Sequence, residues 1–121
     1  MNAIIGKVTT TQASILHGDH HIVLAGTFAE GLTDLKAGML LKLTVSGAGE
    51  YTPVLDTVEG ADADEACAVL LEDVADVAEV DVESVAVHGV VRKEKLLIAD
   101  GVTAPSAAAI AALAARGIYA A

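Results

Sequence analysis

The stretch Asp81-Val-Glu-Ser-Val-Ala-Val-His-Gly-Val-Val-Arg-Lys93 decides the fold class of this chain. From Ser84 to Arg92 its side chains alternate between two faces, as the side chains of a β-strand do. One face is predicted to carry Val85, Val87 and Val91, and the other Ala86, His88 and Val90. Valine is a β-branched residue that favours strands. The stretch therefore predicts the clearest strand in the sequence.

A helix is predicted farther along, because residues 107–115 are helix-favouring throughout. Its cap is expected at Thr103 or Ala104, just before a proline that suits the first helical turn. Gly117 is a natural left-handed stop. The buried stripe of this helix is predicted to be Ile110, Leu113 and Ala114.

Shorter apolar runs predict further strands at 39–45, 50–55, 66–74 and 96–99. Pro53 places the second of these at a sheet edge. The run 66–74 keeps a helical alternative, because alanine and leucine are good helix formers. The acidic residues that follow it predict an exposed loop. Together the patterns predict a compact, mainly β domain with a C-terminal α-helix, in the α+β class.

The first part of the chain differs from the rest. In residues 1–34 the apolar clusters are short and are separated by polar stretches, whereas residues 35–121 read as a globular domain. The pattern at 1–34 predicts an extended N-terminal arm that becomes ordered on a partner, or an edge hairpin. Such an arm is suited to adding a strand to the sheet of another subunit.

Composition narrows the class of function. The chain has 121 residues, of which 54% are hydrophobic but only 2% aromatic, so it offers few large anchors for a ligand pocket. Seventeen acidic residues against seven lysines and arginines give a net charge of −10, which repels nucleic acid. Neither a membrane span nor a secretory signal is recognisable, so the expectation is synthesis in the cytoplasm.

The candidate chemical groups are sparse. His17, Asp19, His20 and His21 are metal-ligand types, but their spacing does not hold them in one geometry, so no metal or other cofactor is expected. His88 lacks an orienting partner in the sequence and is expected to be an interfacial or core histidine. The single cysteine, Cys67, excludes an internal disulfide and is expected to be buried and inert. These observations predict a protein that is not an enzyme.

Several segments resemble, in order, the lambda-type head decoration proteins of tailed bacteriophages. They are Leu35-Lys-Ala-Gly-Met-Leu-Leu41, Tyr51-Thr-Pro-Val54, Ala66-Cys-Ala-Val-Leu-Leu-Glu-Asp-Val74, Val85-Ala-Val-His-Gly-Val-Val91 and Leu113-Ala-Ala-Arg-Gly-Ile-Tyr119. The resemblance covers about residues 35–120, and the N-terminal region shows no match that can be placed on the family's pattern.

The resemblance implies a β-clip-like domain and homotrimers at local three-fold positions of the expanded phage head. There they would bridge neighbouring major capsid proteins, on the virion surface, and resist the pressure of packaged DNA. No direct contact with nucleic acid or membrane is implied. Arm contacts with the capsid are predicted at Ile4, Ile5, Val8 and Ile15, and trimer packing at Leu70 and Ile110.

Two other readings compete with this one. The first is a small β module that binds a partner protein in a bacterial assembly. The second is a small metal-dependent enzyme that uses His17, His20 and His21.

Overall fold

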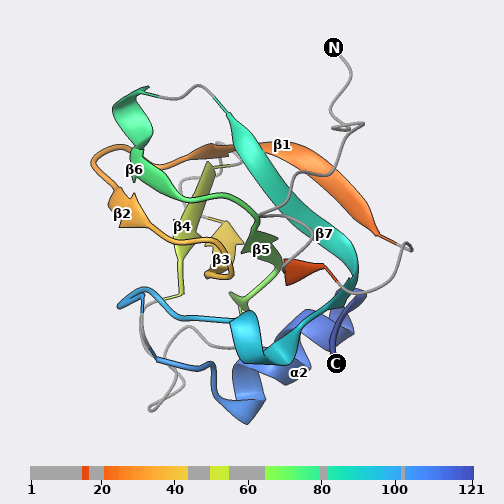
Figure 1. Ribbon diagram of the computed structural model, residues 1–121. Helices are drawn as coiled ribbons and strands as arrows, with labels where there is room; N and C mark the ends of the chain where they lie inside the picture. The colour runs from red at the N-terminus through yellow and green to blue at the C-terminus, as the bar shows by residue number, and fades with distance from the viewer. Residues whose placement is uncertain (1–14, 17–20, 44–49, 55–64, 80–81, 102) are drawn as a thin grey trace.

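The computed structural model describes residues 15–16, 21–43, 50–54, 65–79, 82–101 and 103–121 (Figure 1). Its elements are, in chain order, β1 (Ile22–Phe28), β2 (Thr33–Leu35), β3 (Leu40–Leu43), β4 (Glu50–Pro53), β5 (Ala68–Leu70), β6 (Val74–Asp76), the 3₁₀ helix η2 (Val77–Glu79), β7 (Glu83–Val91), the 3₁₀ helix η3 (Lys93–Lys95), α2 (Ala107–Ala115) and β8 (Ile118–Ala120). The prediction of a mainly β fold with a C-terminal α-helix is confirmed.

The main sheet closes on itself. Its strand order is β1-β4-β3-β5-β7-β8. Because β1 also pairs with β7, a ring forms from β1, β4, β3, β5 and β7. Strand β7 runs antiparallel to β1 and to β5, while its last three residues, Gly89–Val91, pair in parallel with β8. Strands β2 and β6 form a separate antiparallel pair beside the barrel (Figure 1). Closure gives each strand of the ring a partner on both sides, which removes the free sheet edges.

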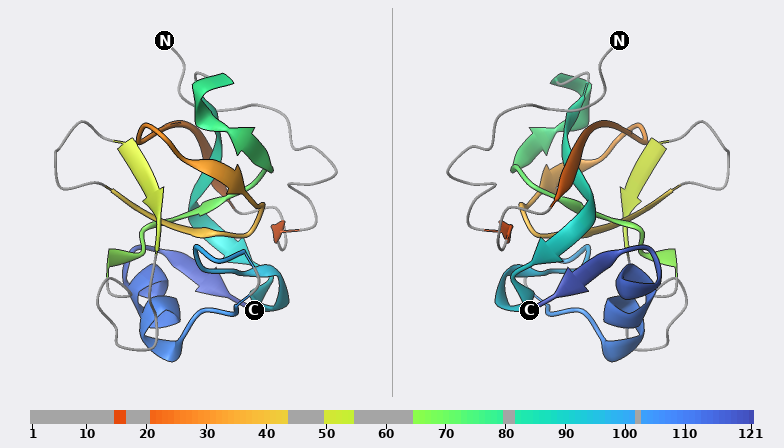
Figure 2. Two further views of the ribbon diagram at one scale, coloured as in Figure 1. Left: turned by 90° about the vertical axis from the view of Figure 1, so that its left-hand side faces the viewer. Right: turned by 90° about the vertical axis from the view of Figure 1, so that its right-hand side faces the viewer.

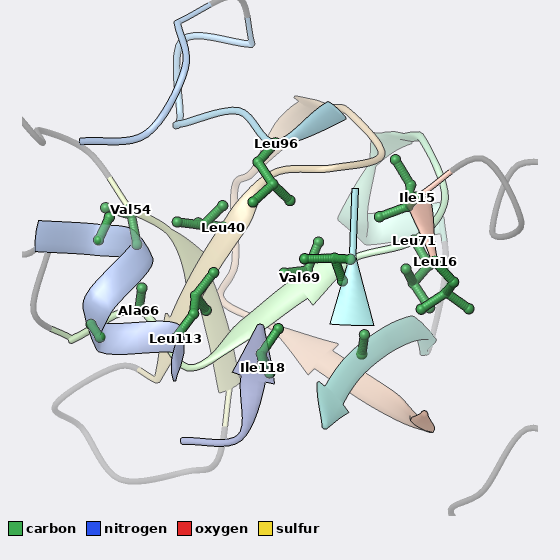
Figure 3. Packing of buried hydrophobic residues seen from close by; sticks show 14 of the residues in the cluster. Ile15, Leu16, Leu40, Val54, Ala66, Val69, Leu71, Leu96, Leu113 and Ile118 are labelled. Atoms are coloured by element: carbon green, nitrogen blue, oxygen red, sulfur yellow. The ribbon is translucent and has the colours of Figure 1, made fainter. Parts of the chain in front are cut away.

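Strand β5 and the first half of β3 are buried on both faces. Leu40 and Val69 belong to an apolar cluster shared with α2 and β8, whereas their neighbours Leu41 and Leu70 belong to a second cluster with Val85. Figure 3 shows part of the first cluster, where side chains from strands and helix gather. A strand covered on both faces reads as a continuous apolar run, which explains the ambiguity of residues 66–74.

Strand β7 is confirmed, but its predicted alternation is wrong at one end. Val85 and Val87 lie with the second cluster, whereas Val91 lies in the first cluster. The pairing with β1 shifts between Ile22 and Val23, whose partners are His88 and Ala86, so that one residue of β7 is extra. Such a β-bulge reverses the alternation beyond it.

The helix is confirmed, with corrections to its cap and its buried face. Ser106 is the N-cap, and its Oγ accepts a hydrogen bond from the Ala109 N–H at 3.3 Å. The buried residues are Ala109, Ala112 and Leu113, so the predicted stripe is right only for Leu113. Small alanines face inward because they let the helix pack closely on the barrel. Gly117 has φ +89°, which confirms the left-handed stop.

Two local predictions were wrong, and one strand was not predicted. Leu97 forms a single bridge with Met39, so residues 96–99 do not make a strand. The expected acidic loop after residue 73 contains β6, which is held by pairing with β2. Strand β8 was not predicted, because its residues become a strand only by pairing with β7. In each case a partner distant in sequence decided the outcome.

The globular body begins before residue 35. Strand β1 pairs with β7 over most of its length, and its Val23 and Phe28 are buried. Residues 22–34, which the sequence pattern assigned to the arm, are therefore part of the body in this structure. Residues 1–14 lie outside the described residues, and an arm there remains a prediction.

Candidate functional site

The chain is fastened to the barrel at Ile15 and Leu16. The Ile15 side chain is 3% exposed, and its carbonyl oxygen accepts a hydrogen bond from the Arg92 N–H at 2.7 Å. Leu16 forms a β-bridge with Val91 at the end of β7. The predicted capsid contact at Ile15 is therefore wrong for this conformation, because its side chain lies in the core. The other predicted arm contacts, Ile4, Ile5 and Val8, lie outside the described residues.

The two residues predicted for trimer packing differ in exposure. Leu70 is 0% exposed inside the barrel, where its N–H donates to the Met39 carbonyl at 2.9 Å, so it is not available to a neighbouring subunit. The prediction for Leu70 is corrected, because continuous burial of β5 leaves no outward apolar face. Ile110 is half-buried on α2 and packs against the first cluster. Its role in trimer packing remains a prediction.

The histidines do not gather into a site within the described part of the chain. His88 is exposed opposite Ile22, which rules out the core alternative for this residue; an interfacial role remains a prediction. His21 is half-buried, and its Nδ1 has no hydrogen-bond partner among the described residues. No group of three or more potential metal ligands occurs among them. His17, Asp19 and His20 lie outside that part of the chain.

A shallow open pocket is lined by Leu43, Glu65, Cys67 and Arg116. Cys67 is half-buried rather than buried as predicted. Burial raises the pKa of its thiol above the ordinary value of 9.0, although a backbone hydrogen bond at Leu43 and the nearby Arg116 lower it in part. Because the neutral thiol is a poor nucleophile, the raised pKa makes Cys67 less nucleophilic than an ordinary cysteine.

We expect the protein to lose stability in alkaline solution. Burial, and in addition the nearby Cys67, raises the pKa of Tyr51 above its ordinary 10.0. The Tyr51 hydroxyl and the Cys67 thiol therefore hold their protons more tightly in the folded protein than in the unfolded chain. This stabilisation is complete below the unfolded-state pKa and is lost as pH rises through the folded-state pKa. Urea unfolding midpoints measured from about pH 7 to about pH 10 should fall in the upper part of this range. Cys67→Ala should make the urea midpoint fall less steeply with pH. An unchanged dependence of the midpoint on pH would contradict the role of Cys67.

Apolar side chains are exposed at several places on the outside. The exposed large hydrophobic residues in the described ranges are Ile22, Leu43, Val82 and Tyr119. Among the same residues, no helix is long and apolar enough to cross a membrane.

The family follows from the sequence match. The family model of the bacteriophage lambda head decoration protein D matches residues 4–118, so the chain belongs to that family. Members are structural proteins that decorate the phage capsid, which places this chain on the virion. No curated protein and no solved structure matches it. The match begins at residue 4, which corrects the narrower resemblance over residues 35–120 and brings the N-terminal region into the family's pattern.

Proposed function

We propose that this chain binds as trimers at local three-fold positions of the expanded phage head and braces it against the pressure of packaged DNA. In this role it bridges neighbouring copies of the major capsid protein, after synthesis in the host cytoplasm. The observation that carries the proposal is the family match over residues 4–118, which includes both the N-terminal region and the barrel.

The anchoring of the N-terminal region supports a load-bearing role. A brace must pass force from its contact with the shell into a body that does not deform. Ile15 and Leu16 attach the chain to the end of β7, through a buried side chain, a hydrogen bond to Arg92 and a bridge to Val91. Strand β7 is in turn paired with β1, β5 and β8. Force applied through the residues before Ile15 would therefore spread over the barrel.

Three copies of the N-terminal segment in one trimer would give tight attachment from weak single contacts. Once one segment binds, the others meet their sites at an effective concentration of about the millimolar order. Extended pairing of Ile4, Ile5 and Val8 with a capsid strand would supply backbone hydrogen bonds without a deep pocket. Sites that open only on head expansion would restrict binding to the mature shell.

Removing residues 2–14 tests the proposal. The truncation stops before Ile15, because the buried Ile15 and Leu16 belong to the core. We expect the shortened chain to keep its folded circular dichroism spectrum and to lose stable binding to expanded heads in co-sedimentation. Multivalent attachment predicts a loss of about a hundredfold or more in apparent affinity.

A matched variant separates loss of contacts from loss of length. The full-length chain with Ile4, Ile5 and Val8 all changed to serine should behave like the truncation, whereas Thr9→Ser should bind normally. On heating, DNA-filled heads without this protein should release their DNA at a lower temperature than decorated heads. If the truncated chain binds expanded heads as well as the full chain does, the proposed attachment is wrong.

A further inference from the structure

An apolar row crosses the outside of three neighbouring strands. Ile22 of β1 lies directly opposite His88 of β7, and Val90 of β7 lies directly opposite Tyr119 of β8. Ile22 is 44% and Tyr119 54% exposed, whereas the alternating residues Val91 and Ile118 are buried. The right-hand view of Figure 2 shows β7 and β8 running side by side on this side of the barrel. We call Ile22, His88, Val90, Arg92 and Tyr119 the outer row.

The charge of the outer row is opposite to that of the chain. Arg92 continues β7 in extended backbone, and the Lys93 N–H donates to the Ala121 carbonyl next to β8 at 2.9 Å. Arg92 in the row and Lys93 beside it are therefore cations, and the row itself contains no carboxylate, in a chain of net charge −10. One exposed carboxylate, Glu94, follows Lys93 and is itself followed by Lys95, whereas exposed carboxylates such as Glu30, Asp34 and Glu79 lie elsewhere on the described surface. The row is therefore complementary in charge to the rest of a second copy.

We infer that the outer row is the surface through which one copy of this chain docks on the next, against an acidic surface of its neighbour. The inference rests on the proposed trimer. A three-fold ring is built from heterologous contacts, in which a surface on one copy meets a different surface on the next. Face-to-face pairing of two outer rows would place both Arg92 side chains in one interface with no carboxylate in either row, whereas a ring brings the row against carboxylates. Ile22 and Tyr119 supply the apolar contact, and Arg92 and Lys93 the charge.

Site-specific photo-cross-linking tests the inference and identifies the protein that contacts the outer row. A benzophenone amino acid is placed at Tyr119 of the full chain, and as a matched control at Val82, which is 41% exposed outside the row. Both proteins are irradiated on expanded heads and in concentrated solution. We expect an adduct with twice the mass of the 12.2 kDa chain from position 119 and not from position 82. Position 119 adducts that contain only the major capsid protein, or no adduct at all, would overturn the inference.

Substitutions measure the size of the effect. Ile22→Ser with Tyr119→Ser should weaken apparent head binding about tenfold or more, because apolar anchors dominate interface energies. Val82→Ser should change it less than about twofold. Arg92→Glu should also weaken self-association, with a loss that shrinks as salt rises. Co-sedimentation with expanded heads also measures binding of the unmodified chain, as the reference for these variants. Normal binding without self-adducts refutes the outer row alone, whereas absent binding refutes the proposed function.

Discussion

Replacing Gly38 by alanine is expected to lower the free energy of unfolding by about 2–5 kcal/mol, from left-handed backbone strain plus overpacking. Gly38 has φ +97°, and a Cβ atom there would overlap the Lys95 carbonyl oxygen. The backbone cannot move away easily. The Gly38 N–H donates to the Leu70 carbonyl at 2.7 Å, and the Gly38 carbonyl accepts from the Leu97 N–H at 2.9 Å. This glycine therefore holds together three segments that are far apart in sequence.

Gly31 provides the control for this substitution. It has a similar φ of +82°, but a Cβ there would meet nothing within 4 Å. Gly31→Ala should therefore cost only the conformational strain, about 1–2 kcal/mol. Chemical denaturation of both variants measures the difference, which isolates the clash with Lys95. Equal losses at the two positions would show that the contact at Gly38 does not matter.

Leu70→Ala is expected to destabilise the fold by about 3–5 kcal/mol, because it removes a fully buried side chain and leaves a cavity. Leu70 is 0% exposed in the cluster that also contains Leu41 and Val85. For a domain whose total stability is about 5–15 kcal/mol, this is a large fraction. The loss should appear as a lower urea midpoint, while the protein that remains folded binds heads normally.

The same substitution at an exposed leucine provides the comparison. Leu43 at the end of β3 is 47% exposed, so Leu43→Ala should cost less than about 1 kcal/mol. If Leu70 were a subunit contact, its replacement would weaken head binding at unchanged stability. That result would contradict the core assignment made from its burial.

Much of the fold could be predicted, because several of its features are local. Alternation identified β7, helix-favouring residues identified α2, and Gly117 marked where the helix ends. The cap at Ser106 was missed by a few residues, because Thr103 and Ser106 both carry a hydroxyl that can accept a capping hydrogen bond. Strand β8 has only three residues and follows the helix at once, so nothing in its own sequence distinguishes it from a loose C-terminal turn.

The candidate site was predicted less well. The order of the apolar segments was enough to place the chain among the head decoration proteins, and the family match supports that assignment. Ile15 and Leu70 were chosen as contact residues because they are apolar, and apolar residues suit either a core or an interface. The outer row was missed because Ile22 was assigned to the arm and because β8, which carries Tyr119, was not predicted.

By itself, the sequence determined the class of fold, the positions of β7 and α2, and the family. These depend on residue periods, on turn chemistry and on the order of motifs along the chain. Only the tertiary structure decided which apolar residues are buried and which are presented to a partner. Barrel closure pairs β1 with β7 across most of the chain, and a single bulge in that pairing changes which side chains face outward. Because burial results from these pairings between distant segments, it cannot be predicted from a local sequence pattern.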